Sequence, residues 1–222
     1  MELHLTRIVI DPRDRTSRAV LRDVHQAHRV VMAGFPDVDE GHARERFAVL
    51  WRYDRPVPPT LLVQSSVPPD HGALSERLAG SRIETKRIGE ILEAAIAPGR
   101  VFSFRLVANP TRKIDTKSGP EGQRRHGRRV PLRRDPDRLA WLDRRFGASG
   151  ARPVVTNGVA DVRIGASTTF RGRRDGRDVT VEGVDFEGRL VVDDSSQFLE
   201  ALRSGIGPGK AYGMGLLTVA GP

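Results

Sequence analysis

Two histidines, His25 and His28, stand three residues apart in a segment whose apolar residues recur at helical spacing. Residues three apart lie on the same side of a helix, so the sequence places the two imidazoles side by side. An imidazole can take up or release a proton near neutral pH, which is what general acid–base catalysis requires. His28 follows Val24 by one helical turn and falls at the edge of the apolar stripe, where a ring can be packed on one side and face a crevice on the other. The pair is therefore a candidate site of proton transfer.

A metal site is the competing interpretation of this spacing, because two histidines on one helix face can share a metal ion. Such a site needs further converging ligands. His4, His42 and His71 are scattered along the chain, no Asp or Glu stands at a matching spacing, and there is no cysteine. We therefore predict neither a metal nor a cofactor. A histidine that packs at the edge of the core is the alternative to a catalytic one.

A second chemical feature lies near the C-terminus, where two Gly-apolar-Gly triplets at residues 205–207 and 213–215 enclose a loop that carries Gly209 and Lys210. Glycine permits positive φ angles and the close approach of a phosphate or another backbone. A P-loop would require Ser or Thr after the lysine, but Ala211 follows it, and the loop follows a predicted helix instead of preceding one. A glycine-capped helix end that leads into a buried strand is the structural alternative.

The charge of the chain indicates a polyanionic partner. Lys and Arg number 37 against 28 Asp and Glu, which gives a net charge of +9, and the pI is near 10.9. Aromatic residues make up only 5% of the chain. This scarcity argues against a protein that stacks on single-stranded bases and favours recognition of a folded stem by its shape.

Two clusters of arginine are candidates for phosphate binding, which would make affinity strongly dependent on salt. The first surrounds an Asp-Gly pair typical of a tight β-turn, so it should lie at the tip of a hairpin. Its members are Arg171, Arg173, Arg174 and Arg177. The members of the second are Arg124, Arg125, Arg128, Arg129, Arg133 and Arg134. A solvated loop is the alternative for both clusters.

Hydrophobic patterning predicts the scaffold that would position these residues. Strands are predicted at residues 3–10, 46–53, 60–66 and 101–108, with helices at residues 16–33, capped by Thr16 or Ser17, and at residues 74–78. This βαββαβ order is that of a ferredoxin-like fold. We predict an α+β chain with such a domain at residues 1–110, a basic linker or loop at 111–128, and a second domain at 129–222 that carries the hairpin and the glycine loop.

Taken together, these features resemble the CasE family, the endoribonucleases that cut CRISPR repeat RNA in the type I-E Cascade complex. The resemblance extends over nearly the whole chain. It is carried by the glycine triplets, by residues 104–110 (Phe-Arg-Leu-Val-Ala-Asn-Pro), by residues 129–132 (Arg-Val-Pro-Leu) followed by Ala-Trp-Leu at 140–142, and by His28.

The resemblance implies two tandem ferredoxin-like (RRM-like) domains and metal-independent cleavage at the base of a repeat stem-loop. The ribose 2′-OH would attack the adjacent phosphodiester and leave a 5′-OH and a 2′,3′-cyclic or 3′ phosphate. His28 matches the family's catalytic histidine, whereas His25 stands where the family carries a tyrosine and is predicted to take its place in catalysis, either as a proton donor or by orienting the scissile ribose. The candidate RNA-binding residues are Arg29, Lys210, Gly207, Gly209, Gly213, Arg128, Arg129, Arg171, Arg173, Arg174 and Arg177. A solvated helix position is the alternative for Arg29.

The partners implied by the resemblance are the repeat RNA, whose cleaved product would be retained, and other Cascade subunits, with no DNA contact for the isolated chain. Two rival hypotheses are a catalytically silent RNA-binding subunit of the same architecture, which the departure at His25 suggests, and an unrelated basic RNA-binding protein. The sequence contains no apolar run of membrane-spanning length, no signal peptide and no cysteine, which indicates a cytoplasmic location without membrane contact.

Overall fold

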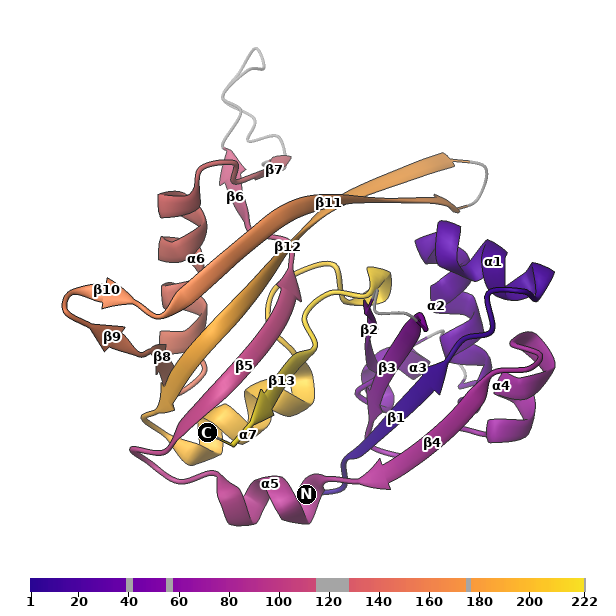
Figure 1. Ribbon diagram of the computed structural model, residues 1–222, viewed down its shortest axis with the longest axis horizontal. Coiled ribbons are helices and arrows are strands. Elements are labelled where there is room, and N and C mark those ends of the chain that lie inside the picture. Colours follow the sequence, from indigo (N-terminus) through magenta and orange to yellow (C-terminus); the bar gives the residue numbers. More distant parts are fainter. Residues whose placement is uncertain (39–41, 55–57, 115–127, 175–176, 222) are drawn as a thin grey trace, which may run out of the picture.

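The computed structural model describes residues 1–38, 42–54, 58–114, 128–174 and 177–221, which form two main antiparallel sheets with helices packed against each (Figure 1). The first elements along the chain are β1 (His4–Val9), α1 (Arg15–Arg22), α2 (Val24–Ala33), α3 (Ala43–Arg46), β2 (Leu50–Asp54), β3 (Thr60–Ser65), α4 (His71–Arg77), β4 (Arg82–Arg87) and α5 (Gly89–Ala95). The remaining elements are β5 (Val101–Ala108), β6 (Thr111–Ile114), β7 (Arg128–Pro131), α6 (Asp135–Gly147), β8 (Ala151–Pro153), β9 (Val155–Thr156), β10 (Val159–Ala160), β11 (Val162–Arg174), β12 (Arg177–Val192), α7 (Ser195–Ser204), the 3-10 helix η1 (Lys210–Tyr212) and β13 (Leu217–Ala220).

The first sheet has the strand order β2-β3-β1-β4. One face of β1 is buried and the other is partly exposed, as alternation along a strand covered on one face dictates. Ile8, Trp51 and Leu61 from the sheet pack with Val30 and Val31 of α2 in one apolar core.

The second sheet has the order β11-β12-β5-β13, and β8 also pairs with β12. Its core is rich in phenylalanine, which supplies a large buried apolar area per residue. Phe104 of β5 meets Phe146 of α6 edge to face, with ring centroids 5.0 Å apart. Phe186 of β12 and Phe198 of α7 complete the same cluster.

The two sheets have the same strand arrangement. In chain order the strands of the first sheet are β1, β2, β3 and β4, and those of the second are β5, β11, β12 and β13. Across each sheet the order is second, third, first and fourth. This is the ferredoxin-like topology. The predicted α+β fold of two tandem ferredoxin-like domains is confirmed.

One strand, β5, lies in the second sheet, although the sequence predicts it in the first. Residues 101–108 are predicted to complete the first domain, but β5 pairs with β12 and β13 in the second sheet, and this assignment is wrong. The fourth strand of the first sheet is β4. Its sequence is mostly polar because it lies at the sheet edge with exposed side chains, so its pattern carries little strand signal.

The segment at residues 129–132 is also predicted to open the second domain. A strand does form there, but β7 pairs with β6 in a separate ribbon that runs from Thr111 opposite Pro131 to Ile114 opposite Arg128. Arg129 and Pro131 are exposed, so this strand could not fill the central position that β5 occupies. Residues 115–127 of the predicted linker lie outside the described residues.

Buried polar contacts join the two domains. The guanidinium of Arg52 on β2, only 3% exposed, forms two hydrogen bonds to Asp54 at 2.8 and 3.2 Å. Its Nη1 also donates to the hydroxyl of Thr218 on β13 at 3.1 Å and approaches the carbonyl of Arg105 on β5 at 3.3 Å. Gln64 donates to the carbonyl of Leu202 on α7 at 2.7 Å. The first sheet therefore docks on the second through satisfied polar groups.

The helices are short. In the part of the chain that the structure describes, none combines the length and the apolar character needed to cross a membrane.

Candidate active site

The helix that carries the histidines, α2, begins where the predicted long helix is interrupted. A single helix over residues 16–33 is predicted, but α1 ends at Arg22 and α2 begins at Val24, because Asp23 adopts an extended conformation. The Asp23 carboxylate accepts hydrogen bonds from the backbone N–H groups of His25 at 2.7 Å and Gln26 at 3.0 Å. These bonds satisfy N–H groups that a helix start leaves without partners.

The prediction that Thr16 or Ser17 caps the first helix is wrong. Asp14, not Thr16 or Ser17, caps α1 by accepting from the N–H of Ser17 at 2.7 Å. α2 ends at Ala33, the predicted end of the helix, and Gly34 follows as its C-terminal cap.

Both histidines lie on α2 and are half-buried. His28 turns its Nδ1 into the protein, since that atom is buried. A ring held in this way can present one nitrogen to a substrate while its orientation is fixed by packing.

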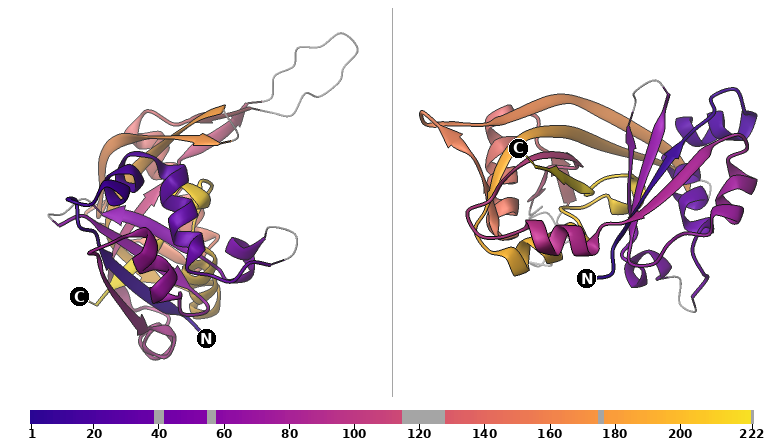
Figure 2. Two further views of the ribbon diagram at one scale, coloured as in Figure 1. Left: turned by 90° about the vertical axis from the view of Figure 1, so that its right-hand side faces the viewer. Right: turned by 60° about the horizontal axis from the view of Figure 1, so that its bottom comes forward.

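The long hairpin of β11 and β12 reaches from the second domain to α2 (Figure 2, right). Its paired strands end with Arg174 opposite Arg177, as the hairpin prediction requires, although residues 175–176 lie outside the described residues. At the contact with α2 the hairpin carries Gly172. A Cβ there would lie 2.9 Å from Oδ1 of Asp23 and 3.0 Å from the backbone N of His25. The absence of a side chain at this position lets the strand touch the start of the histidine helix.

Two of the predicted hairpin arginines flank this contact. Arg171 and Arg173 are exposed, and with Arg22 they line an open hollow of about 480 Å³ that also includes Asp23, Asp178 and Thr180. The three guanidinium groups outnumber the two carboxylates, so the lining has a net positive charge, which suits a phosphate. Arg22 is not recognisable from the sequence as part of this hollow, because there it is an ordinary charged residue at the end of a helix.

The glycine-rich loop also contacts α2, through η1. Gly209 and Gly213, on either side of η1, have φ angles of 89° and 77°, which favour glycine. Packing adds to this requirement, because a Cβ at Gly213 would lie 2.8 Å from the Trp51 ring and one at Gly207 would lie 3.0 Å from the Trp141 ring. Backbone conformation and packing on the two tryptophans thus explain these glycines without RNA, and their role in RNA binding stays a prediction.

Lys210 is the cation of this loop and is half-buried. Burial lowers its pKa, and the nearby positive charge of Arg44 lowers the pKa further. Arg44 and Lys210 line an open hollow of about 290 Å³ together with residues 207–209. A lysine whose charge is unfavourable in the free protein is one that an anion would stabilise. Arg44 was missed because it lies far from the loop in the sequence.

The other predicted RNA-binding residues lie on α2 and on the β6–β7 ribbon. Arg29 is an exposed residue of α2. Arg128 and Arg129 lie on the β6–β7 ribbon, where Arg129 is exposed. The side chains of Arg128, Arg174 and Arg177 lie outside the described parts, as do Arg124 and Arg125. Among the residues that are described, no three His, Asp or Glu side chains gather in a possible metal site.

Comparisons with known proteins agree on one family. The sequence profile of a family described as CRISPR-associated protein matches residues 3–221. The CRISPR-associated endoribonuclease Cse3 of Thermus thermophilus is 35% identical over 226 residues, which cover 97% of this chain and 99% of that protein. The CRISPR system Cascade subunit CasE of Escherichia coli is 29% identical over 98% of this chain and 99% of its own. A solved structure of Thermus thermophilus Cse3 bound to an RNA that represents a pre-cleavage complex has a TM-score of 0.83 and 32% identity, and the match covers 99% of this chain and 100% of that one.

Proposed function

The chain belongs to the CRISPR-associated protein family, and from this membership we infer that it is an endoribonuclease that cleaves CRISPR precursor RNA within its repeats and works as a Cascade subunit. The structural observation that best supports this function, apart from family membership, is that two basic elements contact the histidine helix α2. There a histidine pair, the end of an arginine-bearing hairpin near its turn and a lysine-bearing glycine loop come from three distant parts of the chain.

The cleavage proposed is metal-independent transesterification. The 2′ oxygen of the scissile nucleotide bonds to phosphorus while its proton passes to a base, and the bond from phosphorus to the 5′ oxygen breaks while an acid protonates that oxygen. His28 serves as base or acid, and His25, one turn before it on the same helix, is its complement. The products are a 5′-OH and a 2′,3′-cyclic phosphate, which water can open to a 3′ phosphate.

The hairpin and the loop are the proposed RNA-binding elements. Arg171 and Arg173 contact the phosphates of the stem, and Lys210 contacts a phosphate nearer the cleaved bond. The exposed arginines of the β6–β7 ribbon extend the basic surface. Retention of the product follows if the stem contacts survive cleavage, because cleavage at the base of a stem leaves the stem intact.

We assign the catalytic helix to an N-terminal domain and the hairpin and glycine loop to a C-terminal one. The division is placed near α5 and not at residue 110, since β5 belongs to the second sheet. A cytoplasmic location is proposed because the family relatives include a subunit of Cascade.

The test is cleavage of a cognate repeat RNA in EDTA, beside the same RNA with a 2′-deoxy sugar at the scissile nucleotide. Cleavage of the first RNA alone is expected, with a 2′,3′-cyclic end on the product. Tight binding without cleavage of either RNA would favour the silent RNA-binding subunit. Cleavage that appears only when divalent ions are restored would overturn the metal-independent mechanism.

A further inference from the structure

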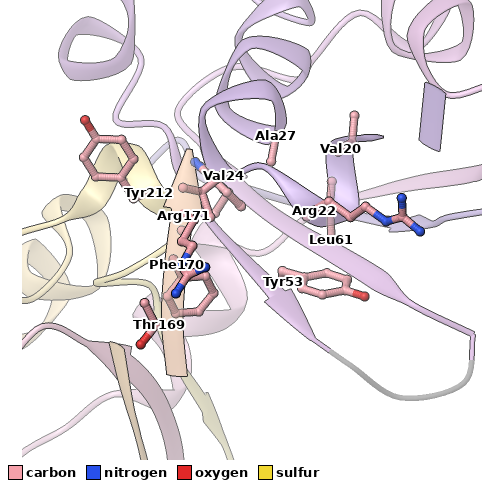
Figure 3. A pocket seen from close by; sticks show the side chains of 12 residues that line it. Val20, Arg22, Val24, Ala27, Tyr53, Leu61, Thr169, Phe170, Arg171 and Tyr212 are labelled. Carbon is pink, nitrogen blue, oxygen red and sulfur yellow. The ribbon is translucent and has the colours of Figure 1, made fainter. Parts of the chain in front are cut away.

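An aromatic hollow lies between the two domains beside the histidine helix (Figure 3). It is lined by Val24 and Ala27 of α2, by Tyr53 of β2, by Phe170 of β11 and by Tyr212 of η1. Ala27 directly precedes His28 on α2, the helix that carries both histidines, although neither histidine is among the residues that line the hollow. We call it the aromatic hollow.

Its composition is unusual for this chain. Aromatic residues make up 5% of the sequence and there are two tyrosines, yet both tyrosines line this one hollow together with Phe170 and Trp51. These residues come from three elements that are far apart in the sequence. The low aromatic content, which argued above against stacking on bases, therefore conceals a local concentration of rings.

The hollow is shallow for a ligand of this kind. It holds about 60 Å³, which is more than the roughly 10–15 Å³ of a single water but less than the roughly 150 Å³ of a cavity that encloses benzene. A base would therefore lie over the half-buried rings at the mouth of the hollow instead of entering it.

The neighbouring space suits the rest of a nucleotide. Arg22 and Arg171 line both the aromatic hollow and the 480 Å³ basic hollow beside it. A phosphate in the basic hollow would therefore lie next to a base over the aromatic one. A chain of ribonucleotides that leaves the stem has both groups at this spacing, and it is unpaired there, so its bases are free to unstack.

We propose that the aromatic hollow binds one unpaired nucleobase of the repeat RNA, adjacent to the scissile phosphate, by stacking on Tyr212 and Phe170. This inference rests on the proposed endoribonuclease function. Capture of the base turns the RNA backbone away from the stem and holds the nucleotide beside His28. In-line attack by a 2′-OH requires such a turn, because a regular helical backbone does not align the attacking and leaving oxygens.

The experiment measures binding of non-cleavable repeat RNA, with a 2′-deoxy sugar at the scissile nucleotide, at one fixed salt concentration. Abasic residues replace the unpaired nucleotides beside the stem one at a time. One abasic position is expected to weaken binding about 5- to 100-fold, the range that loss of one base–aromatic stack produces. Tyr212→Leu should cause a similar loss with intact RNA, and no further loss with that abasic RNA, because the two changes remove the same contact.

Matched variants separate stacking from folding. Tyr212→Phe keeps the ring and should bind as the unaltered protein does, and Phe170→Leu should repeat the Tyr212→Leu result. Phe47→Leu changes an aromatic residue that packs on Phe35, outside the hollow, and should leave the abasic effect unchanged. Thermal melting of each variant confirms that it is folded.

The inference is overturned if every abasic RNA binds as tightly as intact RNA, or if the losses from Tyr212→Leu and the abasic residue add. In either case the unaltered protein would still cleave repeat RNA, so the proposed function would stand. If the unaltered protein neither bound nor cleaved repeat RNA, the proposed function and this inference would fail together.

Discussion

At the scale of single residues, the arrangement of His28 gives its chemical role a clear test. Its Nδ1 is buried while the residue as a whole is half-buried, so we expect Nε2 to be the nitrogen that exchanges protons with RNA. We predict that His28→Ala slows cleavage by about 10²- to 10⁴-fold, the usual contribution of a general acid or base, while RNA affinity changes little. Single-turnover cleavage and filter binding measure the two effects. His71→Ala, an exposed histidine on α4, is the control, and equal cleavage by both variants would refute the assignment.

His25 stands where the family carries a tyrosine, so substitution in both directions is informative. If it completes the acid–base pair, His25→Ala should slow cleavage by about 10²-fold or more, whereas His25→Tyr should retain much of the rate. The alkaline limb of the rate–pH profile should move upward in His25→Tyr, because a phenol keeps its proton to higher pH than an imidazolium. An unchanged profile would mean that His25 moves no proton.

We expect the charge of Lys210 to strengthen RNA binding without stabilising the folded protein in the absence of RNA. Burial, followed by repulsion from Arg44, lowers its pKa below the ordinary 10.5, so its charge disfavours the folded state at neutral pH and stability should rise as pH increases toward 10.5. We predict that Lys210→Met leaves the melting temperature at pH 7 equal or higher. RNA binding should weaken, and the plot of log affinity against log salt should become shallower by about 0.9, as expected for loss of one phosphate contact. A lower melting temperature would contradict this.

How much of the site could be predicted depends on the range of the interactions. His28 was found from local spacing and from a resemblance. The contact of Gly172 with residue 25, and the gathering of Tyr53, Phe170 and Tyr212, depend on how two domains dock. No local pattern carries that information.

At the scale of elements, the close contact of β11 with α2 controls where the arginines lie. A Cβ at residue 172 would meet Asp23 at 2.9 Å, so something must move. We predict that Gly172→Val destabilises the protein by about 1–3 kcal/mol through overpacking and lowers cleavage at saturating RNA. Urea denaturation and single-turnover rates measure both.

Gly147→Ala is the control for that variant, because a Cβ at this position would have no neighbour within 4 Å and the helix end has ordinary backbone angles. It should leave both quantities unchanged. A Gly172→Val protein as stable and active as this control would show that the hairpin does not need the contact.

The elements themselves were predictable where burial is one-sided. β3 and the β11–β12 hairpin lie where patterning and the Asp-Gly pair predict them. β4 was missed because an edge strand with exposed polar residues lacks alternation, and β5 was assigned to the wrong sheet because a buried strand does not reveal its neighbours. Strand pairing is a long-range property, and patterning is a local one.

At the scale of the whole molecule, Arg52 ties the two domains together. Its side chain is 4% exposed and that of Asp54 is 12% exposed, so replacement of Arg52 leaves a buried carboxylate beside Arg105 alone. We predict that Arg52→Met costs about 3–5 kcal/mol of unfolding free energy, the typical effect of breaking a buried ion pair. Arg82→Met, which breaks an exposed pair with Glu84, should cost about 0–1 kcal/mol.

Urea denaturation followed by circular dichroism and by fluorescence would measure these changes. Coincident transitions in the unaltered protein are expected if the domains unfold as one unit. Separate transitions, or equal losses in both variants, would contradict a cooperative interface.

The packing of the glycine loop has an optical consequence. The chain has two tryptophans, one in each domain, and both lie against this loop, with Trp51 beside Gly213 and Trp141 beside Gly207. Indole emission changes in wavelength and intensity with its surroundings, and no third tryptophan adds a background. The protein thus carries an intrinsic reporter of its loop and of its domain interface, readable in the unlabelled chain while RNA binds.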